Sequence, residues 1–425
     1  MLEKLDPRQL QLPDLEIEEQ DGALFESLPY SDFRRWVPEN SIYTNALNQI
    51  PNLNRLSNVK CLSFLSYVGP DPKNTYFIEF PHSRLDHTLT VALITEEMLK
   101  QNGFSQDQIN LGIVAALLHD IATPAYGDAT KQVDPVNLHE ENHWQKMLDK
   151  EGKDFIHQFG TEKMLDTIIK NQGVLGKVLD VSDRITYTMK DLSALQIIAP
   201  LETGQKSQIL LRKINKIITR YPKIGNIYKT VGVDQRKPEV FFNDPQMLNV
   251  FLNLRAHLHQ KLYMHPTNQA KDLFVSKAIG QLYSNDKSPI LNPDNLRQMN
   301  DYELMKTLSK FYNRSAVVMH LNLVNWRAEF RKFSSIDRAK EEERMLKQKE
   351  NIAVIGIKDC QGFNPATDYK VFDGHNYVDF KYYDISAADE IEKTADATRG
   401  IYLFWTDVSE KSEINDLIKT VLKIN

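Results

Sequence analysis

The sequence has 425 residues, of which 41% are hydrophobic and 26% are charged. This composition is typical of globular proteins and excludes a largely disordered chain. The 52 Lys and Arg against 57 Asp and Glu give a net charge of −5, so we do not expect a nucleic acid partner. The two cysteines, Cys61 and Cys360, exclude a disulfide framework and are too far apart in sequence for a cysteine-based metal motif.

Residues 1–40 are acidic and interrupted by Pro13, Pro29 and Pro38, which predicts an N-terminal arm. They contain no apolar stretch of signal-peptide length, and no window has the roughly 18 apolar residues of a membrane span. We therefore expect a cytoplasmic protein without a membrane partner. Residues 41–334 have a mostly helical pattern and are predicted to form one large helical domain.

Two neighbouring helices are predicted early in this domain. The first covers Thr88–Asn102 and stops at Gly103. The second begins after Ser105, whose hydroxyl can accept from the free N–H groups of the first turn. It contains LGIVAALL at 111–118. Because this stretch is apolar on every side, we expect the second helix to be buried in the middle of the fold.

The pattern changes after Ser334. The charged residues 335–350 predict a solvated helix or linker, and residues 351–357, 369–380 and 400–406 predict strands because they are rich in β-branched and aromatic side chains. Asp373-Gly374 predicts a hairpin turn, and residues 413–424 an amphipathic helix. We therefore predict a small α+β domain at 335–425.

The buried helix ends in His119-Asp120. Buried polar groups need partners, so this pair predicts either hydrogen bonds to the neighbouring backbone or a bound metal ion. His87 lies in SRLDHTLTV, and Asp183 lies in another mostly apolar helical stretch. Two imidazoles and two carboxylates suit Mn, Fe or a similar divalent ion, with positions left for water or phosphate oxygens.

The order of these residues resembles the metal-binding pattern of the HD superfamily of metal-dependent phosphohydrolases, and within it the deoxynucleoside triphosphate triphosphohydrolase (dGTPase-like) family is the nearest match. The resemblance covers residues 50–275. It includes AALLHDIATPAYGD, the spacing of Asp183, Tyr187 and Asp191, and LNLRAHLHQKLYMHP at 252–266. It implies a mainly α fold, with an HD-type helical core followed by the small α+β domain.

The resemblance also implies an activity and a site. The activity is hydrolysis of a deoxynucleoside triphosphate to the nucleoside and tripolyphosphate by a homo-oligomer. The cofactor would be a divalent metal ion, one of Mn, Fe, Mg, Co, Ni or Zn. Its ligands would be His87, His119, Asp120 and Asp183. Phosphates and sugar would contact Arg84, Arg184, Tyr187, Asp191, Arg255 and Tyr263, where arginine grips phosphate with two hydrogen bonds at once.

The sequence departs from the family pattern around the catalytic turn. Thr123 stands where relatives carry His or Asn, Asp128 where they carry His, and Lys131 where they carry an acid. His139-Glu140 matches a further family segment, so we assign His139 to proton transfer, assisted by Asp128. The alternatives are another HD phosphohydrolase, acting on a different phosphate ester, and a non-catalytic nucleotide sensor, which Thr123 and Asp128 favour.

A competing motif occupies the same stretch. Residues 139–143 read His-Glu-Glu-Asn-His, the H-E-x-x-H pattern of zinc peptidases. On a helix His139 and His143 would share a face, and Glu140 would serve as base. The surrounding residues are unusually polar for a buried zinc helix. Glu162 could be a third ligand, but nothing in the sequence marks it out. We therefore rank the peptidase below the phosphohydrolase.

Overall fold

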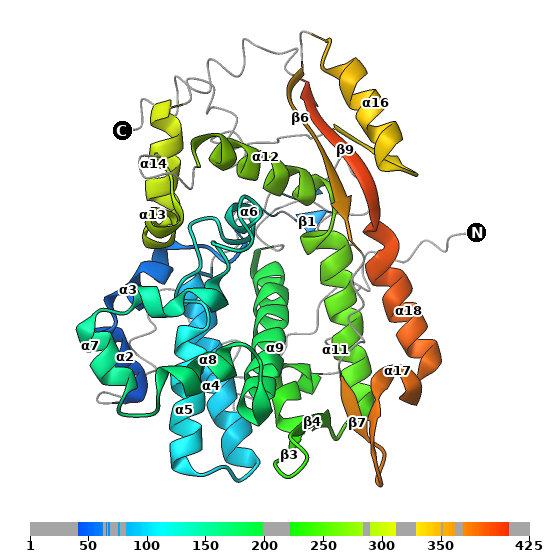
Figure 1. Cartoon of the computed structure of the whole chain (residues 1–425). Helices are drawn as coiled ribbons and strands as arrows, with labels where there is room; N and C mark the ends of the chain where they lie inside the picture. The colour runs from blue at the N-terminus through cyan, green and yellow to red at the C-terminus, as the bar shows by residue number, and fades with distance from the viewer. Residues whose placement is uncertain are drawn as a thin grey trace.

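The computed structural model describes residues 41–62, 65, 67–68, 75–76, 82–198, 222–283, 290–311, 329–349, 352–361 and 369–407. The described chain is mainly helical with a few small sheets, as predicted (Figure 1). The arm at 1–40 and the C-terminal helix at 413–424 lie outside the described residues. In the described part of the chain, every helix is too short or too polar to cross a lipid bilayer.

Four helices form the centre of the N-terminal part: α4 (Arg84–Gln101), α5 (Gln106–Leu118), α8 (Glu162–Ile169) and α9 (Gly173–Ile198). Capping boxes at Ser83 and Ser105 fix the starts of α4 and α5, because each serine and the side chain three residues later satisfy each other's free N–H groups. The cap at Ser83 starts α4 four residues earlier than predicted. The burial of α5 is confirmed, since residues 111–118 are all buried.

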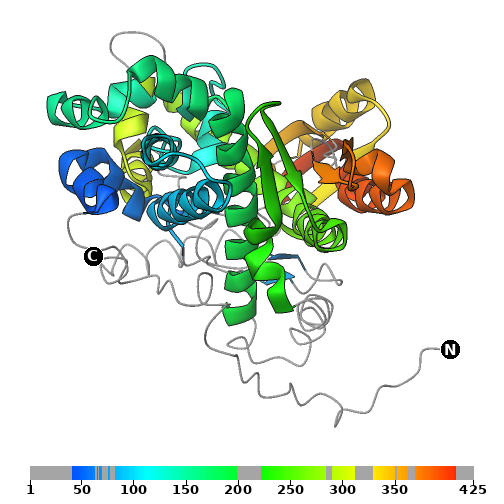
Figure 2. The ribbon, with the colours of Figure 1, turned by 90° about the horizontal axis from the view of Figure 1, so that it is seen from below.

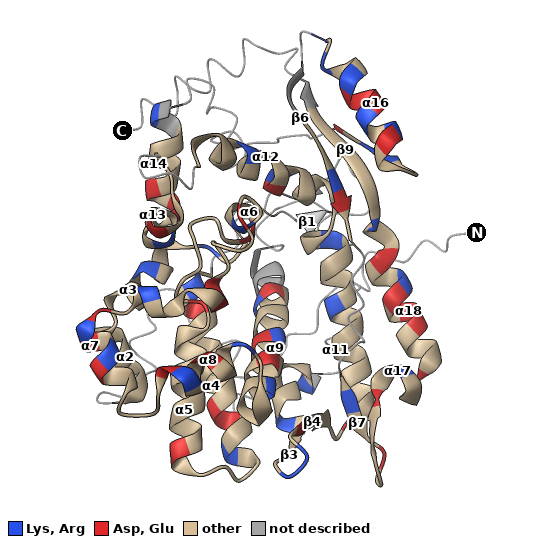
Figure 3. Cartoon of the chain, in the orientation of Figure 1, with Lys and Arg blue, Asp and Glu red and all other residues tan. Residues whose placement is uncertain are grey.

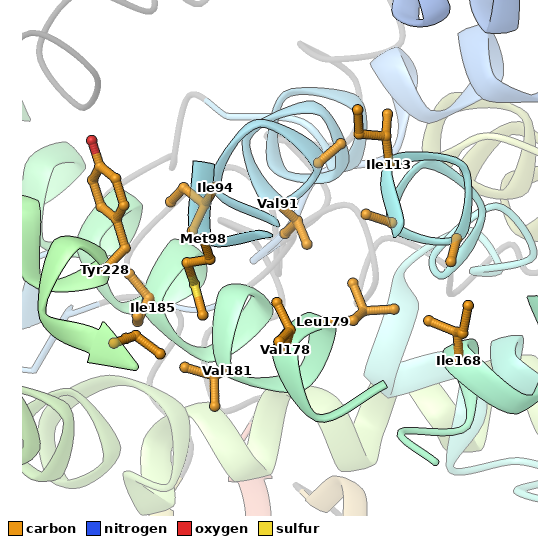
Figure 4. Packing of buried hydrophobic residues seen from close by; sticks show 14 of the residues in the cluster. Val91, Ile94, Met98, Ile113, Ile168, Val178, Leu179, Val181, Ile185 and Tyr228 are labelled. Atoms are coloured by element: carbon orange, nitrogen blue, oxygen red, sulfur yellow. The ribbon is translucent and has the colours of Figure 1, made fainter. Parts of the chain in front are cut away.

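The apolar side chains of these helices interlock in one core (Figure 4). Val91 and Met98 of α4 lie opposite Val178 and Ile185 of α9, and Ile113 extends the core into α5. The short helices α2 (Ile42–Gln49), α3 (Pro51–Arg55) and α7 (Lys150–Ile156) cover one side of it (Figure 1).

The connection after α5 is compact. His119-Asp120 follow the last turn of α5, and the chain then turns into the short helix α6 (Gly127–Lys131). Gly127 has a φ of 47°, and a Cβ there would lie 3.3 Å from Nη2 of Arg84. Glycine therefore lets α6 approach the start of α4 closely.

The H-E-x-x-H stretch is not an α-helix. Residues Glu140–Asn142 form a 3₁₀ turn (η4), followed by another at Trp144–Met147 (η5). The helical face that His139 and His143 would need as a zinc pair is therefore absent from this described stretch. This part of the peptidase interpretation is wrong.

A second group of helices follows: α11 (Pro245–Leu258), the π-helical segment η7 (His259–Tyr263), α12 (Pro266–Leu282), α13 (Pro293–Gln298) and α14 (Asp301–Phe311). Residues 222–230 form a 3₁₀ segment, η6 (Pro222–Thr230). Seen from below, α9 lies between the N-terminal helices and the C-terminal elements (Figure 2).

The predicted strands exist, but they belong to different sheets. β6 (Ile352–Cys360) and β9 (Gly400–Asp407) pair antiparallel with each other, and β9 also pairs with β5 (Glu329–Phe333). β7 (Lys370–Phe372) and β8 (Tyr377–Asp379) form a hairpin, whose turn at Asp373-Gly374 is confirmed. β7 then pairs parallel with β4 (Glu239–Phe242), the partner of β3 (Val231–Asp234). A further two-stranded pair joins β1 (Tyr67–Val68) and β2 (Thr75–Tyr76).

Residues after 334 pack with residues before it. α16 (Ile336–Leu346) is the predicted solvated helix, while α17 (Phe380–Tyr383) leads into α18 (Ile385–Ala395), which packs on α11. Tyr369 and Phe380 belong to the main core. Tyr402 and Phe404 of β9 belong to a second core with α6 and α12. The division of the chain at 334 remains a prediction.

Candidate active site

Three side chains from three helices converge as a metal-ligand set. Nε2 of His87 lies 2.8 Å and Nε2 of His119 lies 3.7 Å from Oδ1 of Asp183. The ligand atoms of all three residues lie within 4.8 Å of one another. Oδ2 of Asp120, the fourth predicted ligand, lies 3.7 Å from His87 and 3.8 Å from His119. The structure thus brings together the four residues that the sequence assigned to the metal.

The hydrogen bonds of His119 show that this set fits a cation. Its Nδ1 lies 2.7 Å from the carbonyl oxygen of Ala116, which can only accept, so Nδ1 carries the proton. Nε2 is buried and has no hydrogen-bond partner in the described structure. A histidine held through one nitrogen with the other facing carboxylates is typical of metal ligands. We infer that the set fits a divalent ion.

The charges of the set are strongly coupled. Burial disfavours the charge on His119, but the carboxylates of Asp120 and Asp183 outweigh it and raise the pKa of His119 to about 9. Burial opposes ionisation of Asp183 as well, yet the neighbouring imidazoles of His119 and His87 hold its pKa well below the usual range. The proton that His119 attracts is the one that a metal ion would displace.

Both oxygens of Asp120 are held by neighbours. Nη1 of Arg84 lies 3.0 Å from Oδ2, and the hydroxyl of Thr123 donates to Oδ1 at 3.1 Å. Thr123 is fully buried. The residue that departs from the family pattern therefore orients the carboxylate of Asp120, a contact that the sequence alone did not indicate.

The metal-ligand set opens into a cavity of about 620 Å³. Nine of the predicted site residues line it: Arg84, His87, His119, Asp120, Asp128, Asp183, Tyr187, Asp191 and Tyr263. Other lining residues had no predicted role in a phosphohydrolase site; they include Cys61, His82, Lys131, Glu140, Glu141, His259, Asp272, Lys358 and Asp359. They come from the chain before α4 and from α6, η4, η7, α12 and β6, so no single sequence motif contains them all.

Asp191 is held at one end of this cavity. The hydroxyl of Tyr263 donates to Oδ2 of Asp191, and Nε2 of His82 lies 2.9 Å from Oδ1. His82 stands two residues before Arg84, which is the one signal in the sequence that could have pointed to it. The ring of Tyr187 meets that of Tyr263 edge to face, with 6.0 Å between the centroids.

The two predicted arginines of α9 and α11 lie behind the cavity wall. Arg255 is buried and donates from Nε to the hydroxyl of Tyr187 at 2.7 Å and from Nη1 to the hydroxyl of Tyr369 at 2.9 Å. Arg184 pairs with Asp180 at 2.9 Å and lines a separate cleft of about 410 Å³. In the described structure neither arginine lines the main cavity, although Arg255 supports Tyr187, which does.

Of the two residues predicted to transfer protons, Asp128 lines the described cavity and His139 does not. Asp128 lines the cavity and lies 2.7 Å from Nζ of Lys131, whose charge lowers the pKa of Asp128 to about 2. Lys131 also lies 2.8 Å from Oε1 of Glu140. His139 is not among the described lining residues, where its neighbour Glu140 appears instead. The role of His139 remains a prediction.

The comparison with known families identifies this part of the chain. Residues 84–195, which contain all four predicted metal ligands, match the HD domain. A crystal structure of a phosphohydrolase from Bacteroides thetaiotaomicron superimposes with a TM-score of 0.60 and 16% identity, over 87% of this chain and 96% of that one.

A hypothetical protein from Aquifex aeolicus superimposes with a TM-score of 0.56 and 16% identity, over 88% of this chain and 95% of that one. At these identities the two structures show a shared fold, which extends well beyond the HD domain itself. A search of curated proteins by sequence gives no match. The HD resemblance is thus confirmed, whereas the dGTPase-like assignment remains a prediction.

Proposed function

We propose that the protein is a metal-dependent phosphohydrolase that converts deoxynucleoside triphosphates to nucleoside and tripolyphosphate. The observation that carries the proposal is the set of His87, His119 and Asp183, which faces a cavity of about 620 Å³. This volume is within the usual range of roughly 300–1,000 Å³ for small-molecule sites. The HD domain match and the fold shared with a phosphohydrolase support the same class.

The residues divide into three proposed roles. The metal set with Asp120 would hold a divalent ion, which lowers the pKa of a bound water and polarises a phosphate oxygen. Arg84 stays charged because Asp120 lies beside it, so it can bind a second anion in the cavity. Tyr187 and Asp191 present a hydroxyl and a carboxylate that suit a sugar.

Proton transfer to the leaving group is assigned to His139 with Asp128. At neutral pH the low pKa of Asp128 makes it an acceptor rather than a donor of protons, so it suits the role of an orienting group. Replacement of His139 by alanine should lower kcat by roughly 10²–10⁴-fold while the substrate still binds. An unchanged kcat would move this role to another group of the cavity, with Glu140 and Glu141 the first to test.

The direct test is a product analysis. The protein is incubated with each dNTP and NTP in the presence of Mn²⁺, Mg²⁺, Co²⁺ or Fe²⁺, and the products are separated by ion-exchange chromatography. Nucleoside with tripolyphosphate supports the proposal, whereas nucleoside monophosphate with pyrophosphate excludes this bond choice. Nucleotide binding without any product would favour the non-catalytic sensor.

One observation favours a second candidate, an HD phosphohydrolase for substrates with fewer phosphates. Among the described lining residues, three cations face a larger number of carboxylates, and two of these cations, Arg84 and Lys131, are already paired with Asp or Glu. Release of orthophosphate from a nucleoside monophosphate in the same screen would select this candidate.

The homo-oligomer also remains a prediction by resemblance. Light scattering coupled to size-exclusion chromatography, with and without nucleotide and metal, measures the assembly directly. A monomer under all conditions would contradict it.

A further inference from the structure

Strand β6 of the C-terminal sheet forms part of the cavity wall. β6 packs on α12, and Lys358, Asp359 and Cys360 line the same cavity as the metal-ligand set. In Figure 1 this sheet lies beside α12, at the opposite side of the molecule from α2 and α7. The HD domain at 84–195 therefore does not enclose its own cavity, and residues from far downstream in the sequence complete it.

The position of β6 against α12 is fixed by close contacts. A Cβ on Gly356 would lie 2.7 Å from Nζ of Lys277 and 2.9 Å from Cδ2 of Leu273. Lys277 donates to the carbonyl oxygen of Ile355 at 2.5 Å. Because side chains alternate along a strand, Gly356, Lys358 and Cys360 share one face. The side chain of Lys358 therefore starts from the face of β6 that is packed on the rest of the molecule.

Lys358 carries a charge that no carboxylate neutralises. Its Nζ donates to Oε1 of Gln132 at 2.8 Å, and in the described part of the chain it has no carboxylate oxygen within 4 Å. Lys131, by contrast, lies between Asp128 and Glu140, and Arg84 pairs with Asp120. Among the lysines and arginines that line the described cavity, Lys358 is thus the one without a carboxylate partner, and its ammonium group has donors left for an anion.

Asp272, an acidic neighbour of Lys358 in the cavity wall, only partly offsets this charge. Asp272 of α12 is buried, and burial raises its pKa to about 7, with the charge of Lys358 acting in the opposite direction. At neutral pH this carboxyl is therefore only partly ionised. Gln132, the hydrogen-bond partner of Lys358, belongs to the chain just after α6, so Lys358 connects the C-terminal sheet to the turn that carries Asp128 and Lys131.

We propose that Lys358 binds a phosphate group of the substrate remote from the metal, so that the C-terminal sheet completes the polyphosphate site. The inference rests on the proposed phosphohydrolase function. The metal set and Arg84 bind the reacting phosphate at one end, while Lys358 binds the far end of the chain of phosphates from β6. Binding at these two points of the cavity, the metal set with Arg84 and Lys358, would favour polyphosphates over monophosphates.

The test measures binding separately from turnover. The preformed complex of Mn²⁺ with inorganic tripolyphosphate is titrated calorimetrically into the full-length wild type and into Lys358→Met, Lys358→Arg and Lys332→Met. Lys332 is an exposed lysine of β5 in the same sheet and does not line the described cavity. Thermal melts and Mn²⁺ titrations of each variant establish that fold and metal binding are intact.

We expect Lys358→Met to weaken binding by about 10- to 100-fold, the range for a lost hydrogen bond to a charged group. Lys358→Arg and Lys332→Met should stay within about threefold of the wild type. Equal affinity of Lys358→Met and wild type, or no binding of tripolyphosphate by the wild type, would overturn the proposal. If the wild type binds tripolyphosphate through Lys358 but releases no tripolyphosphate from any dNTP, only the proposed reaction fails.

Discussion

His119 donates from Nδ1 to the carbonyl of Ala116 and presents Nε2 to His87 and Asp183. The sequence identified His119 and its neighbour Asp120, because a buried apolar helix that ends in two polar residues is unusual. It could not identify which nitrogen faces inward, since that depends on the backbone of the last turn of α5. It also gave no role to Thr123, whose contact with Asp120 exists only in the folded chain.

The two competing histidine motifs make opposite predictions for metal content. His119→Ala removes a ligand of the HD set and should abolish bound Mn²⁺ while the helical circular dichroism is retained. His143→Ala is the matched control, because the ring of His143 lies 3.4 Å from the carbonyl oxygen of Val136 and does not line the described cavity. Inductively coupled plasma mass spectrometry measures the metal content of both variants. If His143→Ala loses the metal and His119→Ala keeps it, the result would contradict the HD site and favour the zinc-peptidase motif.

Thr123 should act through Asp120. Thr123→Val keeps the shape of the side chain and removes the hydroxyl that donates to Oδ1 at 3.1 Å. We expect the affinity for Mn²⁺ to fall by about 10–100-fold, the usual effect of removing a partner that orients a metal ligand. Thr188→Val is the control, since this buried hydroxyl donates to the carbonyl of Arg184 in its own helix. The prediction fails if both variants bind Mn²⁺ equally.

Asp272 gives the stability a dependence on pH. Burial raises the pKa of Asp272 in the folded protein from its ordinary value of 3.8 to about 7. The carboxyl therefore does not reduce stability below about pH 4, and it lowers the free energy of unfolding progressively as the pH rises towards 7. Asp272→Asn should therefore gain stability over the wild type between pH 4 and 8, by at most about 4 kcal/mol. Thermal melts at pH 4 and at pH 8 measure this difference in stability, and the variant Asp359→Asn, at an exposed residue, is the control. A constant difference across the range would contradict the prediction.

Helical periodicity places the predicted cavity face of α9 correctly, but it does not hold from α11 into η7. Asp183, Tyr187 and Asp191 were predicted to share a face of α9, and all three line the cavity. Arg184 is one residue on, which rotates it by about 100°, and it points to the separate cleft. Arg255 and Tyr263 were both predicted to contact phosphates or sugar, but of the two only Tyr263 lines the described cavity. The π-helical segment η7 (His259–Tyr263) changes the angle about the helix axis between these two side chains. No residue in that stretch predicts a π-helix from the sequence.

The wall between α9 and α11 depends on Tyr369, the residue just before β7. Tyr369→Phe removes the hydroxyl that accepts from Nη1 of Arg255 at 2.9 Å and leaves a buried donor with one partner fewer. We expect a loss of about 1–3 kcal/mol in the free energy of unfolding, measured by urea denaturation. Tyr382→Phe, an exposed tyrosine in α17, is the control and should cost little. Equal stability of both variants would show that Arg255 does not need this contact.

At the scale of the whole chain, the C-terminal residues are part of both cores. The sequence predicted the strands after 334 because β-branched and aromatic runs are local signals. It did not predict that β7 would pair with β4, because pairing between distant segments leaves no local pattern. The same holds for Lys358 and Asp359, which reach the cavity from β6. Local chemistry was predictable, and the long-range assembly was not.

This packing predicts the behaviour of a shortened chain. A protein that ends at Ser334 lacks Tyr369, Phe380 and Phe404 and leaves the apolar surfaces of α11 and α12 uncovered. We expect it to lose cooperative unfolding and to aggregate, as measured by calorimetry and light scattering. A cooperative melt close to that of the full chain would instead establish 335–425 as a separable domain.

The parallel pairing of Phe242 with Val371 also sets an order of events during synthesis. His87, His119 and Asp183 have all left the ribosome before the second half of the chain is made. Tyr369, the partner of Arg255, lies just before β7 and follows Arg255 by more than a hundred residues. This is a delay on the order of 10 s at usual rates of translation. A nascent chain can thus assemble the metal-ligand set well before Tyr369 and Lys358 complete the walls around it.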